Sequence, residues 1–173
     1  MGKIYDAPFG LLFYAITVSN KKLFKEIENI LIKKYGDILL ETEAINFSSK
    51  TDYYEAEMGE CLWKKYYTFR NIITSEKIYN LKIESNNLEN HSKLLGKRTI
   101  NLDPGFITLF NFSLLTTKGY SHRIYLEKGI YSEITLIYKG KKYTDLPWTY
   151  PDYKSKFVLQ LLENSRLFLK NKL

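Results

Sequence analysis

The sequence predicts an α+β protein, and three observations lead to this prediction. Residues 11–18 form a continuous apolar run with the length of a strand that is buried on both faces. Residues 23–31 place their apolar side chains on one face of a helix. Glycine-centred turn signals recur in the second half of the chain and predict hairpins. A chain of 173 residues has the length of one domain, so we expect a single domain over residues 1–173.

The first half of the chain is expected to alternate strands and helices. Ser19 is the expected N-cap of the first helix, and Gly36 is its expected C-terminal stop. Thr74 or Ser75 is expected to cap a second helix, which ends at Gly96. Between the helices we expect a strand, a turn or short helix, and a further strand, over residues 37–47, 53–60 and 62–73.

The middle of the chain carries the strongest local turn signal. A short strand over residues 99–102 leads into Asp103-Pro104-Gly105. Pro presets the first central angle of a turn and Gly supplies the left-handed one, so this tripeptide predicts a type II turn. Residues 106–117 are apolar and are expected to form a strand or a helix.

A hairpin follows. Its expected strands, residues 122–126 and 130–138, flank Glu127-Lys128-Gly129 as a three-residue loop with Gly at the left-handed position. If residue 126 pairs with residue 130, the numbers of directly opposed residues sum to 256. A second, tighter turn is expected at Lys139-Gly140.

The chain is expected to close with an aromatic loop, residues 146–153, that Pro brackets. The last 18 or so residues are expected to form an amphipathic helix, with apolar residues between Phe157 and Phe168 on one face. The order of elements is therefore β-α-β-β-α-β, then further antiparallel strands, then a helix. A helix between two strands, repeated once, is the split βαβ arrangement of ferredoxin-like folds. We expect a ferredoxin-like split βαβ core with an extended antiparallel sheet and a C-terminal helix.

Composition excludes several classes of protein. An apolar fraction of 45% supports a core and excludes a largely disordered chain, and no apolar run is long enough to span a membrane. The net charge of +7 comes from 22 Lys and only 4 Arg, whereas nucleic-acid binders usually concentrate Arg in a basic stripe. The charge therefore favours a solvated surface, with weak non-specific RNA binding as the alternative. The single cysteine and the absence of a signal sequence favour the cytoplasm.

Arg123 and Glu133 are the first candidate site residues. The expected register places them directly opposite each other, within reach of a salt bridge. The pair is either structural or a grip on an anionic ligand, with Glu133 orienting Arg123. The same register sets His122 opposite Ile134, on the other face of the hairpin. His122 is a candidate general acid or base, or a satisfied residue at a strand end.

Asp103 is the second catalytic candidate, and its alternative role is a hydrogen bond to the backbone of the predicted turn. Further candidate ligand-binding residues come from the loops: Lys118, Trp148, Tyr150 and Asp152. The aromatic ones form either a wall for a base or sugar ring or a rigid cover over the sheet.

Three acidic residues, Asp52, Glu55 and Glu57, could supply oxygen ligands to a hard cation, but they lack the spacing of an EF-hand loop. We therefore expect a solvated acidic loop and no metal site there. The residues point to no particular cofactor. Cys61 has no cysteine partner and is expected to be a small buried apolar residue.

Four segments together resemble a known family. They are TDYYEAEMG at residues 51–59, NLDPG at 101–105, HRIYL with GIY between 122 and 131, and LPWTYPDY at 146–153. In this order and spacing they resemble the bacterial family called domain of unknown function 4416. The resemblance implies an identity and no mechanism. Some members carry a GTP-binding label, but the Gly-Lys pairs here lack the Ser or Thr of a phosphate-binding loop.

Three functions follow as expectations. The first is binding of a small anionic metabolite or nucleotide between Asp103, the start of the His122 strand and the aromatic loop. The second is a hydrolase- or transferase-type enzyme that uses Asp103, His122 and Arg123 at the same place. The third is an RNA- or protein-interaction module on an exposed Lys- and Tyr-rich face. Convergence of Asp103 and His122 would favour the enzyme, and a flat face would favour the module. The residues do not predict the oligomeric state.

Overall fold

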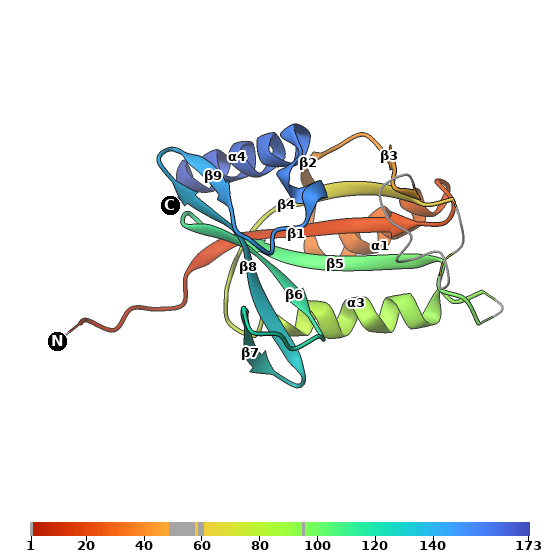
Figure 1. Cartoon of the computed structure of the whole chain (residues 1–173), viewed down its shortest axis with the longest axis horizontal. Helices are drawn as coiled ribbons and strands as arrows, with labels where there is room; N and C mark the ends of the chain where they lie inside the picture. The colour runs from red at the N-terminus through yellow and green to blue at the C-terminus, as the bar shows by residue number, and fades with distance from the viewer. Residues whose placement is uncertain (1, 49–57, 59–60, 95) are drawn as a thin grey trace.

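The computed structural model describes residues 2–48, 58, 61–94 and 96–173. It is an α+β structure with a large antiparallel sheet of nine strands (Figure 1). In chain order the elements are β1 (Phe9–Val18), α1 (Leu23–Tyr35), β2 (Ile38–Glu41), β3 (Ile45–Asn46), β4 (Trp63–Thr74), α3 (Tyr79–His91), β5 (Ile100–Ile107), β6 (Asn111–Thr116), β7 (Arg123–Glu127), β8 (Ile130–Lys139), β9 (Lys142–Asp145), the 3-10 helix η2 (Pro151–Lys154) and α4 (Lys156–Lys170).

The strands follow the order β2-β4-β1-β5-β6-β8-β7, with β3 paired to β4 and β9 paired to β8. All neighbouring strands are antiparallel. Helices cover both faces of this sheet: α1 and α3 pack on one face and α4 on the other (Figure 1). Among the described residues, no helix is long and apolar enough to cross a membrane.

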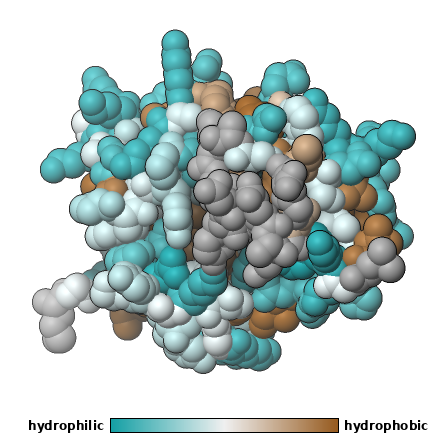
Figure 2. All heavy atoms as spheres, turned by 45° about the vertical axis from the view of Figure 1, so that its right-hand side comes forward, coloured by the Kyte–Doolittle hydropathy of each residue, from teal (hydrophilic) through white to brown (hydrophobic). Residues whose placement is uncertain are grey.

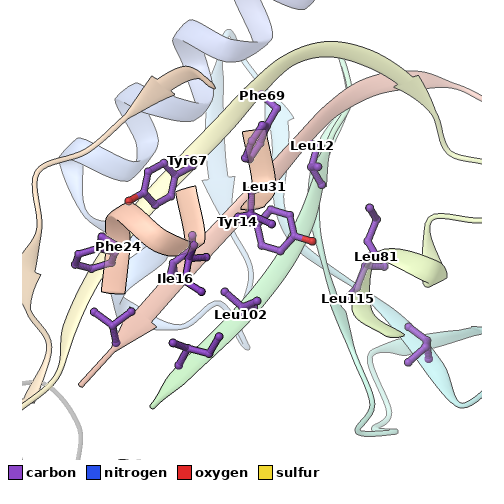
Figure 3. Close-up of a cluster of buried hydrophobic side chains, with 14 of the residues drawn as sticks. Leu12, Tyr14, Ile16, Phe24, Leu31, Tyr67, Phe69, Leu81, Leu102 and Leu115 are labelled. Carbon is purple, nitrogen blue, oxygen red and sulfur yellow. The ribbon is translucent and has the colours of Figure 1, made fainter. Parts of the chain in front are cut away.

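Strand β1 lies at the centre of the sheet and is buried on both faces, as its continuous apolar run predicts. The side chains of Leu12, Tyr14 and Ile16 all point to the face that α1 and α3 cover, and they belong to one core cluster (Figure 3). Leu11 and Phe13 point to the other face, into the cluster beneath α4. One strand therefore supplies side chains to both halves of the core.

The starts of the two first helices differ from the prediction. Helix α1 begins at Leu23, and the Ser19 backbone N–H bonds the carbonyl of Thr99, so Ser19 extends the sheet and does not cap the helix. Thr74 ends β4, and α3 begins only at Tyr79 without a side-chain cap. Gly36 is confirmed as the stop of α1, because it adopts a φ of 89° and its N–H bonds the Ile32 carbonyl.

Two predicted strands are also refined. The stretch 37–47 is divided into β2 and β3, both of which pair with β4. Residues 106–117 are strand, shared between the end of β5 and β6. The turn or short helix expected over residues 53–60, and the acidic run at 52–57, lie outside the described residues, apart from Met58. Cys61 is exposed, which corrects the expectation that it is buried.

The type II turn predicted at Asp103-Pro104-Gly105 is wrong, because the tripeptide lies inside β5 and pairs with β1. Strand β6 pairs only with the second half of β5, from Gly105 onward, so the first half has an open edge. Leu102 directs its backbone groups to that edge. Residues two apart in a strand direct these groups to the same side, so Pro104 also faces the open edge and loses no ladder bond.

Gly105 is required for packing, since a Cβ there would lie 2.8 Å from both the Phe112 ring and the Ser113 carbonyl oxygen.

The hairpin between β7 and β8 turns on two residues, and the predicted three-residue loop is wrong. Lys128 and Gly129 both adopt positive φ, at 51° and 77°, and Glu127 pairs with Ile130. A turn with two positive φ angles matches the twist of the flanking strands. A bulge after Tyr125 then restores the predicted register toward the start of the strand, so Arg123 does lie opposite Glu133.

Candidate functional site

Arg123 and Glu133 form a buried ion pair between β7 and β8. Arg123 Nε donates to Glu133 Oε2 at 2.7 Å, and one terminal nitrogen of the guanidinium, Nη1, donates to the Lys118 carbonyl at 2.9 Å. Only 12% of the Arg123 side chain and 3% of the Glu133 side chain are exposed. The register that the hairpin sets is the direct cause of this pairing.

His122 joins the same carboxylate, which corrects the expectation that it lies on the other face. Its Nε2 is 3.0 Å from Glu133 Oε2. Strand β7 begins only at Arg123, so His122 does not have to follow the alternation of side chains between the two faces of the sheet. Its ring lies on the Glu133 side.

Trp148 reaches this group from the aromatic loop. Its ring stacks on His122 with centroids 4.7 Å apart and planes 14° apart. Its indole N–H donates to the carbonyl of Ile134, which fixes the ring against β8. The rings of Tyr120 and His122 are also in contact, with centroids 5.2 Å apart and planes 62° apart. We call Glu133, Arg123, His122, Trp148 and Tyr120 the Glu133 cluster.

One oxygen of Glu133 has no partner. Oε2 accepts both bonds, whereas Oε1 is buried and has no hydrogen-bond partner in the part of the chain that the structure describes. A buried acceptor that makes no hydrogen bond costs about 1–3 kcal/mol, and more when it is charged. Among the described residues, Glu133 Oε1 therefore keeps its capacity to accept a hydrogen bond unused, as do the buried Thr17 Oγ1 and Tyr143 hydroxyl oxygens.

A second polar cluster surrounds Asp103, at the open edge of β5. Asn101 donates to one Asp103 oxygen at 2.8 Å, and Lys82 Nζ lies 3.5 Å from the other. Lys82 also donates to the Leu102 carbonyl at 2.7 Å and lies 3.8 Å from Glu89. Arg98 Nη1 donates to Glu89 Oε2 at 3.2 Å. We call Asp103, Asn101, Lys82, Glu89 and Arg98 the Asp103 cluster.

Glu89 is the most buried carboxylate of this cluster, at 5% exposed. Burial raises its pKa, while Lys82, the Leu102 N–H and Arg98 oppose the rise. Sequence reasoning missed both Lys82 and Glu89. The sequence feature that could have identified the pair is their separation of seven residues, which places both on the same face of a helix.

Asp152 lies in a third group, beneath η2. Its Oδ2 accepts from Lys64 Nζ at 2.7 Å and from the Tyr66 hydroxyl at 2.9 Å. Burial and then the Asp152 charge raise the pKa of Tyr66. Asp152 is therefore the partner of a buried lysine, and no ligand is needed to explain its position.

Two further candidate ligand-binding residues lie at the surface: Tyr150 in the aromatic loop is 55% exposed, and Lys118 is also exposed.

Asp103 and Glu133 lie on one face of the sheet, but they belong to separate groups. Gly105, Leu114 and Glu133 are directly opposed across β5, β6 and β8. Asp103 lies two residues from Gly105, so strand geometry separates the Cα atoms of Asp103 and Glu133 by about 12 Å. Asp103 bonds Asn101 and Lys82, and His122 bonds Glu133. The two catalytic candidates therefore do not form an acid–base pair.

Two surface hollows lie elsewhere. One, of about 400 Å³, lies between the β2–β3 segment and α4, and one of about 310 Å³ lies between α1 and α3. Neither is lined by residues of the Glu133 or Asp103 cluster. Across the described residues, no group of three or more His, Cys, Asp and Glu side chains could hold a metal ion. On the face drawn in Figure 2 the described surface is largely hydrophilic, with separate hydrophobic spots.

The fold and these clusters define an α+β protein whose antiparallel sheet carries buried charged groups at the edge of β5 and in the β7–β8 hairpin. A family model described as a domain of unknown function, DUF4416, matches residues 8–168, and the chain belongs to this family. No curated protein and no solved structure matches the chain.

Proposed function

We propose that the protein binds a small polar ligand, an anionic metabolite or a nucleotide, at the Glu133 cluster. The observation that carries this proposal is Glu133 Oε1, a buried carboxylate oxygen without a partner among the described residues. An N–H or O–H group of the ligand would donate to this oxygen and remove the cost of leaving it unpaired.

Arg123 supplies the contact for the anionic part of the ligand. Nε and Nη1 are used within the chain, while Nη2 has no hydrogen-bond partner in the described part of the protein. A guanidinium N–H that donates to a phosphate or carboxylate oxygen makes a strong, charge-assisted bond. The ligand we propose therefore combines a hydrogen-bond donor, for Glu133, with an anionic group, for Arg123.

Entry to this site requires a small rearrangement. Glu133 Oε1 is buried, but Tyr120 is 69% exposed, and the His122 and Trp148 side chains are only partly buried. Separation of the stacked His122 and Trp148 rings would open a path to the carboxylate. Lys118 is exposed next to Arg123 and adds positive charge at this entrance.

Binding is better supported than catalysis. A catalytic role for Asp103 and His122 would need both groups to act on one substrate, and each is held by partners of its own. We also place the protein in the cytoplasm, because the exposed, unpaired thiol of Cys61 suits a reducing compartment.

We further infer that the core is ferredoxin-like. The order β2-β4-β1-β5 with antiparallel neighbours supports this assignment, as does the packing of α1 and α3 on the same face. The Asp103 and Glu133 side chains lie on the opposite face of the sheet, and the proposed site lies where the added strands β7 and β8 meet the aromatic loop.

A thermal-shift screen of the purified full chain tests the proposed binding. The panel contains nucleotides, phosphorylated metabolites and a short RNA, each at two salt concentrations. A ligand at 100 times its dissociation constant adds about 2.7 kcal/mol to the free energy of unfolding. Wild-type protein is compared with Glu133→Gln and Arg123→Lys, and with Glu163→Gln as the control on the exposed face of α4.

A shift that Glu163→Gln keeps and the other two variants lose supports the site. No shift from any small molecule, with an RNA shift only at low salt, overturns the proposal and favours the interaction module. A ligand that stabilises the wild type and Glu133→Gln equally also overturns it, because Oε1 then has no role.

A further inference from the structure

The hollow between α4 and the β2–β3 segment is a groove of about 400 Å³ with an apolar lining. Its apolar side chains are Leu40, Ile45, Phe157 and Leu161, and its charged lining residues, Glu41 and Glu43, are both acidic. Glu41 pairs with Lys65, whereas Glu43 has no ion-pair partner among the described residues. The groove therefore suits an occupant with apolar side chains and a positive charge.

The chain carries a segment with this chemistry at its N-terminal end. Residues 2–8 project from the start of β1, away from the body of the protein (Figure 1). Ile4 is 94% exposed and Tyr5 is 79% exposed, the two highest values among the large apolar residues that the structure describes. Lys3 precedes them and supplies a positive charge, whereas the negative charge of Asp6 follows them, nearer to β1. Burial of the two apolar side chains would be favourable by about 1.5–3 kcal/mol each.

The segment cannot fill the groove of its own chain. Phe9 lies opposite Thr74 on β4, whereas Thr42, in the middle of the groove lining, bonds Tyr66 of the same strand. Eight residues along β4 and two strand spacings across separate these points by about 28 Å. Ile4 precedes Phe9 by five residues, which span about 18 Å when fully extended. A second copy of the chain has no such limit.

We propose that residues 3–5 of one copy occupy the groove between α4 and β2–β3 of a second copy, with Asp6 outside the acidic groove. Ile4 and Tyr5 bury against the apolar lining, and Lys3 approaches Glu43 of the second copy. When two copies exchange their segments reciprocally, both grooves are filled and the assembly closes as a symmetric dimer. This inference is independent of the ligand proposed for the Glu133 cluster.

Cysteine cross-linking tests where the segment lies. In a Cys61→Ser background, Ile4→Cys is combined with Ile45→Cys in the groove. The matched control combines Ile4→Cys with Leu167→Cys, because Leu167 is exposed on α4 and does not line the groove. Under mild oxidation we expect the first pair to give a band of twice the 20.5 kDa chain mass on a non-reducing gel, and the control pair to give little.

The oligomeric state is measured in parallel by light scattering over a range of concentrations. We expect the wild type to be a dimer that dissociates in Ile4→Ser/Tyr5→Ser, with melting of the variant still cooperative. A wild type that is monomeric throughout overturns the proposal. So does equal cross-linking of both pairs, or a disulfide that forms only within one chain.

Discussion

Glu89 Oε1 accepts a hydrogen bond from the backbone N–H of Leu102 at 2.7 Å, at the edge of β5 that β6 leaves open. Lys82, on the same face of α3 as Glu89, donates to the backbone carbonyl of Leu102. Two helix side chains thus take the place of a neighbouring strand and satisfy both backbone groups of Leu102. Unpaired backbone groups in a buried position are costly, so this cover is part of the stability of the fold.

Glu89→Ala is therefore expected to destabilise the protein by about 1–3 kcal/mol, because it leaves the Leu102 N–H without an acceptor and removes one of the two carboxylates beside the buried Lys82. Urea denaturation measures the change. Glu26→Ala, on the exposed side of α1, is the control and should lie within about 0.5 kcal/mol of wild type. A loss below 1 kcal/mol for Glu89→Ala would show that β5 does not depend on this contact.

The pKa of Glu89 leads to a prediction with a definite sign. Burial raises this pKa above its ordinary 4.5, so the folded protein binds the proton more tightly than the unfolded chain does. Between the two pKa values the folded state holds more protons, and the stability from this group is therefore lost as the pH rises. The free energy of unfolding of wild type minus that of Glu89→Gln should be largest below pH 4.5 and decrease toward neutrality. A difference that increases with pH would contradict the assignment.

Sequence reasoning predicted the elements of the fold that depend on local pattern. The buried strand around Tyr14 and the stop at Gly36 follow from apolar periodicity and backbone preference. The register between Arg123 and Glu133 was correct although the loop behind it was not, because the bulge after Tyr125 offset the shorter turn. The turn predicted at Pro104 was wrong because proline is tolerated both in a turn and at an open strand edge. Only the pairing of β5 distinguishes the two.

The site was less predictable than the fold. The hairpin register brings Arg123 and Glu133 together, and this register can be derived from the sequence. Trp148 meets His122 only through the path of the aromatic loop, and Lys82 meets Asp103 only through the packing of α3 on β5. These contacts join residues far apart in the chain, and no local pattern specifies them.

The buried pair of Lys64 and Asp152 provides a third prediction. Lys64→Met leaves the Asp152 charge buried with only the Tyr66 hydroxyl as partner, so we expect a loss of about 3–5 kcal/mol. The double variant Lys64→Met/Asp152→Asn removes both charges and keeps an acceptor for Tyr66, and should recover most of this loss. Urea denaturation of the single and double variants measures the coupling.

The exposed pair of Lys154 and Asp145 is the matched control, with the same 2.7 Å separation as Lys64 and Asp152. Lys154→Met should have little effect, because solvent screens the charges of exposed pairs. Equal losses for Lys64→Met and Lys154→Met would mean that burial does not set the strength of the inner pair.

The last prediction concerns Gly105. It distinguishes the strand conformation that the structure shows from the turn that the sequence predicted. A Cβ at this position would lie 2.8 Å from the Phe112 ring and 3.1 Å from the Phe13 ring, between strands that cannot easily move apart. Gly105→Ala is expected to destabilise the protein by about 1–3 kcal/mol through this overpacking. In a Phe112→Leu background the same Gly105→Ala change should cost less than in the wild type, since the smaller side chain relieves the ring contact and leaves the contact with the Ser113 carbonyl oxygen. A strained turn angle at Gly105 would respond differently, because removing the Phe112 ring could not relieve it.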